Sequence, residues 1–171
     1  LQEIWESKLE PVYPYRKAGP TVEKINGKLN APAAPKIGVA KPKVIIPVFP
    51  GTNCEYDTAK AFARAGADPE ILVIRNLTPA DVTASCEALV KAIGESQIVM
   101  LPGGFSGGDE PEGSGKFIAS FLRSPALTDA IHDLLKNRDG LMLGICNGFQ
   151  ALIKLGLVPY GDIRPITAYD P

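Results

Sequence analysis

The chain has 171 residues, of which 45% are hydrophobic and 22% are charged, and its formal net charge is -1. A chain of this length and composition can bury a core of its own, which argues against wholesale disorder. The near-neutral net charge provides no excess of positive charge for binding nucleic acid. No apolar run approaches the roughly 20 residues that a membrane helix needs. We therefore expect a globular protein with neither nucleic acid nor membrane as a partner.

Cysteine usage indicates a reducing environment. The three cysteines, Cys54, Cys86 and Cys146, are too few and too scattered for a disulfide scaffold. No two of them form a C-x-x-C pair, so we expect no zinc site and no bound metal. A cytoplasmic location follows as the prediction.

Residues 1–41 differ from the rest of the chain in composition and in hydrophobic pattern. Five of the first 40 residues are proline, and no stretch there keeps a helical or alternating apolar period for long. This composition predicts a linker or a surface-bound arm. The alternative is the tail of a preceding domain, with Trp5, Tyr13 and Tyr15 docking on a partner surface.

From residue 42 onward, short apolar runs alternate with segments of helical spacing. The run 44–49 is β-branched and ends at a Pro-Gly turn, and Thr78 with Pro79 is typical of a helix start. In chain order, we predict strands over 44–49, 71–74, 98–101 and 141–144, and helices over 55–66, 79–93, 116–123, 125–137 and 147–155. This alternation predicts an α/β domain over 42–171, a flavodoxin-like parallel sheet with helices on both faces. Its working loops should follow the carboxyl ends of the strands, at 50–54, 102–115 and 145–148.

Cys146 lies where the last predicted strand runs into a helix. The segment 144–150 reads Gly-Ile-Cys-Asn-Gly-Phe-Gln, the cysteine form of a nucleophile elbow. Such a turn needs small residues two positions before and two after the nucleophile, and Gly144 and Gly148 occupy them. The helix N-terminus favours a negative charge there, and the Asn147 N–H can point at an oxyanion. The alternative is a buried cysteine beside two packing glycines.

A glycine-rich segment, 103–109, directly follows the third predicted strand. It could be a flexible surface loop or a phosphate cradle, but it lacks the G-K-[ST] ending of a P-loop. An oxyanion hole fits better, with the Gly104 N–H as donor. In the 50–54 loop, Asn53 could hydrogen-bond a substrate.

Three further residues are weighed and set aside as catalytic groups. Cys54 has no base adjacent in sequence and is interpreted as a packed or bystander thiol, and Cys86 as structural. His132 lies in the helix before the last strand, where its side chain should face solvent or an interface, so we reject it as the base for Cys146.

Taken together, these motifs resemble those of class I glutamine amidotransferases. Three segments carry the resemblance: 144–150, Pro-Gly-Thr-Asn-Cys-Glu at 50–55, and Pro-Gly-Gly-Phe-Ser-Gly-Gly-Asp at 102–109. More narrowly, they resemble the glutaminase domains of phosphoribosylformylglycinamidine synthases, over about residues 42–163.

The resemblance implies a mechanism and a set of partners. Cys146 would attack the glutamine side-chain amide and release ammonia, with the Gly104 and Asn147 N–H groups holding the oxyanion. Asn53, Phe105, Ser106 and Gln150 would contact the substrate. The ammonia would pass to a synthetase domain of the same enzyme, which carries ATP and magnesium, so no cofactor is expected in this chain. Residues 1–41 would be the linker and tail of that domain.

The family's catalytic histidine and glutamate lie in a His-x-Glu motif downstream of the nucleophile, and these 171 residues contain no such motif. We therefore expect a domain that is incomplete at its C-terminus and inactive by itself. Two alternatives stay open: a Cys-elbow hydrolase of the intracellular protease and chaperone-like branch, and a non-catalytic docking module of the same fold.

Overall fold

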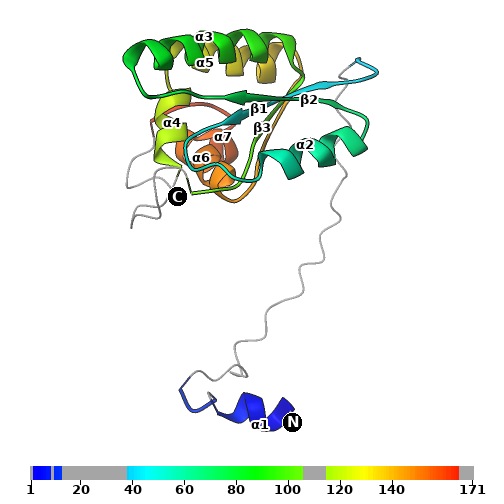
Figure 1. Cartoon of the computed structure of the whole chain (residues 1–171), viewed down its shortest axis with the longest axis vertical. Coiled ribbons are helices and arrows are strands. Elements are labelled where there is room, and N and C mark those ends of the chain that lie inside the picture. The colour runs from blue at the N-terminus through cyan, green and yellow to red at the C-terminus, as the bar shows by residue number, and fades with distance from the viewer. Residues whose placement is uncertain (1, 9, 13–37, 106–114, 166–171) are drawn as a thin grey trace. The chain divides into compact units, whose positions relative to one another are not determined.

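The computed structural model of the chain describes residues 2–8, 10–12, 38–105 and 115–165. The chain divides into two compact units, Leu1–Ala33 and Ala34–Pro171 (Figure 1). The first unit contains helix α1 (Gln2–Ser7), on which Ile4 and Trp5 are exposed. Tyr13 and Tyr15 lie outside the described residues. The assignment of 1–41 to a linker and tail stays a prediction.

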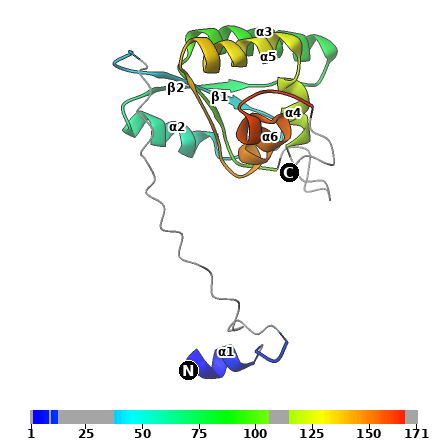
Figure 2. The ribbon, with the colours of Figure 1, turned by 180° about the vertical axis from the view of Figure 1, so that it is seen from behind.

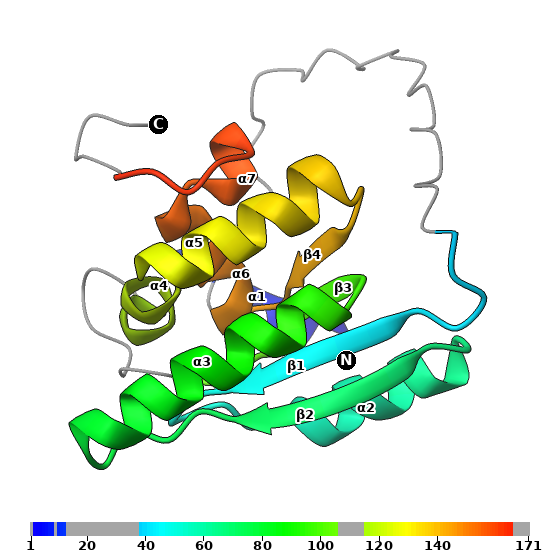
Figure 3. The same cartoon turned by 90° about the horizontal axis from the view of Figure 1, so that it is seen from above.

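The second unit is built on a four-stranded parallel sheet. Its strands are β1 (Lys43–Val48), β2 (Asp68–Val73), β3 (Ile98–Leu101) and β4 (Leu141–Gly144). They lie in the order β2-β1-β3-β4, and all three pairings are parallel, which Figure 3 shows from above. The order reverses between β1 and β3, so the carboxyl ends of these two strands flank a topological switch point.

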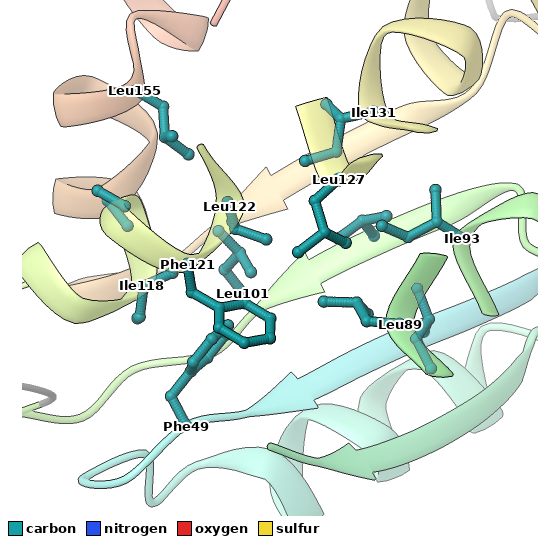
Figure 4. Close-up of a cluster of buried hydrophobic side chains, with 14 of the residues drawn as sticks. Phe49, Leu89, Ile93, Leu101, Ile118, Phe121, Leu122, Leu127, Ile131 and Leu155 are labelled. Carbon is teal, nitrogen blue, oxygen red and sulfur yellow. The ribbon is translucent and has the colours of Figure 1, made fainter. Parts of the chain in front are cut away.

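Helices cover both faces of the sheet, as predicted. Figures 1 and 2 show α2 (Glu55–Arg64) on one side and α3 (Pro79–Glu95) with α5 (Pro125–His132) on the other. The larger core lies under α3, α5, α4 (Lys116–Leu122) and α6 (Asn147–Leu155), and Figure 4 shows it. Phe49, at the end of β1, makes edge-on contacts with Phe117 and Phe121 of α4. The smaller core, which includes Met100, packs against α2.

The predicted boundaries hold closely for most elements. α3 begins as expected, because Thr78 accepts the Asp81 N–H at 3.1 Å while the Asp81 carboxylate accepts the Thr78 N–H at 3.2 Å, a capping box. β2 begins at residue 68, three residues before the predicted start, because the strand pairs with β1 along its whole length and not only over its apolar run.

The helix predicted over 125–137 changes character within that range. α5 ends at His132, and a π-helical turn, η1 (Asp133–Asn137), continues it. Directly after this turn the Arg138 guanidinium donates to the carbonyls of Ile93, Gly94 and Ser96, which are the last acceptors of α3. Arg138 therefore caps the α3 C-terminus from another element, which local sequence spacing does not reveal.

The strand β4 contains no fully buried residue. Leu141 and Leu143 are exposed on it, while Met142 packs into the larger core. An apolar hollow of about 430 Å³ lies between α2 and β4, lined by Phe62, Leu143 and Ile145 among others. The structure ends with the short helix α7 (Leu157–Tyr160) and the described residues up to 165. No helix of the described part of the chain is long and apolar enough to cross a membrane.

Candidate active site

Cys146 occupies the turn between β4 and α6 in a conformation that few side chains adopt. Its φ and ψ are 51° and -109°, and its side chain is exposed. A non-glycine residue at positive φ costs stability, and such strain gathers where a side chain must be presented to a ligand. The geometry is that of a strand-to-helix elbow with the sulfur at the carboxyl end of the sheet.

The two glycines that flank Cys146 leave no room for side chains. A Cβ on Gly144 would lie 2.6 Å from the Gly148 carbonyl oxygen and 2.7 Å from Leu152 Cδ1. A Cβ on Gly148 would overlap the carbonyl group of Leu101 in β3. The elbow therefore exists because β3, β4 and α6 approach one another at van der Waals distance, and this packing holds Cys146 in its strained backbone.

The first turn of α6 places the two residues predicted to act with Cys146. The Gln150 N–H donates to the Cys146 carbonyl at 3.0 Å, which starts the helix. Asn147 is fully buried, and its side-chain amide donates to Gln150 Oε1 at 3.4 Å. The Asn147 N–H belongs to this first turn beside the elbow, where helix N–H groups point toward the N-terminal end.

Residues 51–53 pair with residues 103–105 across the switch point. The Asn53 N–H donates to the Gly103 carbonyl at 3.3 Å, and the Phe105 N–H donates to the Gly51 carbonyl at 2.9 Å. Thr52 and Gly104 lie opposite each other in an antiparallel bridge. Both bonds flank Gly104 and neither uses its N–H. A Cβ on Gly104, where φ is 150°, would lie 2.8 Å from the Thr52 Cα, so no other residue fits.

Cys54 lies nearer to Cys146 than the sequence interpretation as a bystander implied. A Cβ on Gly103 would lie 3.5 Å from Cys54 Sγ and 3.6 Å from Cys146 Cβ. The Cys54 thiol is exposed and donates to Asn53 Oδ1 at 3.2 Å. One signal could have found this: each cysteine directly precedes a helix after a parallel strand, so both lie at the same edge of the sheet.

The remaining predicted residues are placed as follows. The Asn53 side chain is exposed and serves as the acceptor for Cys54. Phe105 is exposed, and Ser106 lies outside the described residues. Cys86 is half-buried in α3, with its Sγ 3.5 Å from Ser124 Oγ. Among the residues that the structure describes, no cluster of three or more His, Cys, Asp or Glu could hold a metal ion.

His132 contacts residues that follow the last helices. Its Nε2 lies 2.6 Å from Asp162 Oδ1 and 3.2 Å from the Ile163 N–H. When protonated, Nε2 donates to Asp162; when it is not, it accepts from Ile163. Lys136 hydrogen-bonds the same carboxylate at 3.1 Å, and this bond lowers the pKa of Asp162 below its usual value. His132 thus holds the 162–163 segment, where the sequence led us to expect solvent or an interface.

The fold and the elbow define a class, and the comparison with known families agrees. Residues 41–171 match the CobB/CobQ-like glutamine amidotransferase domain, and the chain belongs to this family. The phosphoribosylformylglycinamidine synthase subunit PurQ of Methanococcus maripaludis strain S2 is 40% identical over 116 residues, which cover 68% of this chain and 38% of that protein. The same subunit from Dehalococcoides mccartyi is 38% identical over 121 residues, 71% of this chain and 43% of that protein.

Among solved structures, the chain is similar to that of PurLQS from Thermotoga maritima. The identity is 30%, the TM-score is 0.47, and the match covers 68% of this chain and 45% of that chain. The chain spans less than half the length of these relatives. The parallel sheet with helices on both faces confirms the predicted α/β fold class. The family match and the PurQ relatives confirm the resemblance to glutaminases of phosphoribosylformylglycinamidine synthases. The roles of the individual site residues stay predictions.

Proposed function

We propose that this chain carries the glutamine-hydrolysing site of a phosphoribosylformylglycinamidine synthase. Membership of the glutamine amidotransferase family and relatives that bear this enzyme's name support the proposal. The observation that carries it is the position of Cys146, a strained elbow residue beside the paired segments 51–53 and 103–105. A glutaminase needs an exposed nucleophile next to fixed N–H donors, and this arrangement supplies both.

In the proposed reaction, Cys146 Sγ attacks the side-chain amide carbon of glutamine. The carbonyl oxygen becomes an oxyanion, the C–N bond then breaks, and the nitrogen leaves as ammonia after taking up a proton. The product on the enzyme is a γ-glutamyl thioester. Water attacks the thioester carbon, the C–S bond breaks, and glutamate leaves with the Cys146 thiol restored.

The backbone of two elements is proposed to stabilise the oxyanion. Gly104 offers its N–H from the strand-like segment after β3, and Asn147 offers its N–H from the first turn of α6. The pairing of 51–53 with 103–105 fixes the first donor, and the helix fixes the second. Donors held rigidly in this way require no reorganisation when charge develops. Gln150, tied to Asn147, is proposed to orient the substrate together with Asn53, Phe105 and Ser106.

Ammonia released at Cys146 is proposed to serve a synthetase domain or subunit of the same enzyme. That partner would bind ATP and magnesium and convert formylglycinamide ribonucleotide into its amidine, a step of purine biosynthesis. This chain would contribute the nitrogen and no cofactor, and the assembly would work in the cytoplasm. In the complete enzyme, amidine formation should depend on glutamine, whereas these 171 residues, which contain no His-x-Glu motif, should release little or no glutamate by themselves.

Covalent labelling tests the nucleophile without requiring turnover. The chain is treated with an L-glutamine analogue that carries an electrophilic carbon in place of the amide, and the adduct is mapped by peptide mass spectrometry. We expect Cys146 to be labelled before Cys54 and Cys86, and L-glutamine to slow this labelling. The Cys146→Ser variant should lose the adduct.

The Cys86→Ser variant is the matched control, because Cys86 lies in α3 and contacts Ser124, outside the elbow and the paired segments. It should be labelled at Cys146 at the rate of the unmodified chain. Equal labelling of all three cysteines, or labelling that L-glutamine does not slow, would contradict the proposed site. D-glutamine should not protect, because only the L-isomer matches the proposed substrate.

A further inference from the structure

We propose that Cys54 and Cys146 form a redox-sensitive thiol pair, in which a hydroperoxide oxidises Cys146 and Cys54 then closes a disulfide with it. The pair itself rests on the geometry of the two turns. Its consequence, a reversible loss of glutamine hydrolysis in the complete enzyme, rests on the proposed function, because the disulfide consumes the proposed nucleophile.

The two side chains face the same space above Gly103. Because a Cβ on Gly103 would lie 3.5 Å from Cys54 Sγ and 3.6 Å from Cys146 Cβ, these two atoms are at most about 7 Å apart. Gly103 puts no side chain of its own into that space. Both cysteines are exposed, so each side chain is able to change rotamer. A disulfide needs the two Cβ atoms about 4 Å apart, so closure requires a shift that brings Cys54 closer to Cys146.

Cys54, which follows the paired segment 51–53, is the residue that can supply this shift. Cys54 precedes α2 with an ordinary backbone conformation, φ -114° and ψ 16°, and its side chain forms no cap to the helix. The backbone hydrogen bonds to 103–105, at 3.3 and 2.9 Å, involve Asn53 and Gly51 and not Cys54. Cys146, by contrast, is fixed by the packing of its flanking glycines. We therefore expect Cys54 to move toward Cys146.

The surroundings of the two sulfurs assign the order of the steps. Each cysteine directly precedes a helix, but the first turn of α2 carries Glu55 and Asp57, whereas the first turn of α6 carries no acid. The first turn of α6 therefore places no carboxylate beside Cys146, whereas the first turn of α2 places two beside Cys54. The Cys54 thiol instead donates its proton to Asn53 Oδ1. Cys146 should react first and Cys54 second.

The chemistry balances with one hydroperoxide for each disulfide. The Cys146 thiolate attacks the outer oxygen of ROOH, the O–O bond breaks, and RO⁻ leaves and takes a proton to become ROH; Cys146 becomes a sulfenic acid. The Cys54 thiolate then attacks the Cys146 sulfur, the S–O bond breaks, and the oxygen leaves as water. Two thiols are oxidised by two electrons, and the peroxide is reduced by two. A dithiol reductant reverses the change.

Hydrogen peroxide is the probe that tests the pair. The reduced chain is exposed to it, remaining thiols are blocked, and the intact mass and the linked peptides are measured. We expect a loss of two hydrogens and a single cross-link between the Cys54 and Cys146 peptides, both restored by dithiothreitol. The Cys86→Ser variant should behave in the same way, because Cys86 lies elsewhere and contacts Ser124.

Two variants separate proximity from general oxidation. In Cys54→Ser, Cys146 should accumulate as the sulfenic acid, detected by a dimedone adduct, and excess peroxide should then oxidise it irreversibly. In Gly103→Ala, the new Cβ makes ordinary contacts with both cysteines and fills the shared space, so disulfide closure should slow several-fold while iodoacetamide labels each reduced thiol at an unchanged rate.

A wild-type chain that accumulates the dimedone adduct at the rate of Cys54→Ser would overturn the proposal, as would cross-links that involve Cys86 equally. This result is independent of the glutamine-analogue labelling of the reduced chain. Labelling without a cross-link would retain the proposed function and reject the thiol pair, and a cross-link without labelling would do the reverse.

Discussion

The turns after β1 and after β4 place a cysteine at the same position by opposite means. Cys54 and Cys146 each follow a parallel strand and directly precede a helix, α2 or α6. The β4 turn is short, and packing against Leu101 holds Cys146 at positive φ. The β1 turn is longer, and hydrogen bonds to residues 103–105 hold it with Cys54 at an ordinary φ.

The two turns differ in backbone strain, which is present at Cys146 and absent at Cys54. A backbone in a sparsely populated conformation persists only where its surroundings over-determine it. The close approach of Gly148 to β3 supplies that constraint at Cys146, whereas nothing comparable acts on Cys54. One turn therefore presents its sulfur in a single fixed direction, and the other leaves its sulfur adjustable. The fixed sulfur, Cys146, is the proposed nucleophile, and the adjustable one, Cys54, is the proposed thiol that closes the disulfide.

The largest effect should come from filling the contact that holds the β4 turn. In Gly148→Ala the new Cβ overlaps the Leu101 carbonyl, so α6 must move away from β3. Overpacking of this kind costs about 3 kcal/mol, and we expect the free energy of unfolding to fall by that amount. Urea denaturation followed by circular dichroism measures it.

Gly94→Ala is the matched control for this substitution. Gly94 lies within α3, and a Cβ there meets nothing within 4 Å. Alanine in a helix interior is better than glycine by about 0.5–1 kcal/mol, so this variant should be more stable than the wild type. If Gly148→Ala were as stable as Gly94→Ala, the tight contact between α6 and β3 would not exist.

The sequence predicted this architecture well because its signals are local. The apolar runs of the strands, the cap at Thr78 and the glycines around Cys146 each lie within a few residues of the element that they define. The β4 turn could be predicted for the same reason, because the glycines that flank Cys146 in the sequence indicate that there is no room for side chains there.

The β1 turn was harder to predict, because its geometry depends on residues between 50 and 92 positions away in the sequence. The bridge of Thr52 to Gly104 and the approach of Cys54 to Cys146 appear only once the sheet brings β1, β3 and β4 together. The same holds for Arg138, which caps α3 across more than 40 residues, and for the placement of His132 against Asp162. Long-range pairings of this kind leave no periodic trace in a single sequence.

Replacing each of the two cysteines by glycine should change the free energy of unfolding in opposite directions. In Cys146→Gly, a residue that adopts positive φ without cost replaces a strained one, which relieves roughly 1–3 kcal/mol and costs about 0.5–1 kcal/mol of added chain entropy. We expect a net gain of about 1 kcal/mol in the free energy of unfolding. Cys54→Gly has no strain to relieve and should lose about 0.5–1 kcal/mol.

Thermal and urea denaturation of both variants under reducing conditions measure the two changes. Reducing agent is needed because a disulfide between the two cysteines would be lost in either variant. Equal destabilisation by both substitutions would show that the backbone of Cys146 is not strained, and the contrast between the two turns would then fail.

The smallest effect should come from exposed charges outside both turns. Hydrogen bonds from Asn137 and Arg138 lower the pKa of the Asp133 carboxyl below its usual value. A carboxyl whose pKa is lower in the folded state stabilises the fold above its unfolded pKa, about 3.9, and this stabilisation is lost as the pH falls through the folded pKa. The free energy of unfolding should therefore decline as the pH falls from about 5 through the folded pKa, and that of Asp133→Asn should decline less. An unchanged decline in that variant would assign the pH dependence to other carboxyls, such as Asp162 beside Lys136.

Because the Asp133 and Asp162 side chains are exposed, salt should weaken this pH dependence. Salt should not change the stability differences at Gly148 and Cys146, because those arise from side-chain contact and backbone conformation.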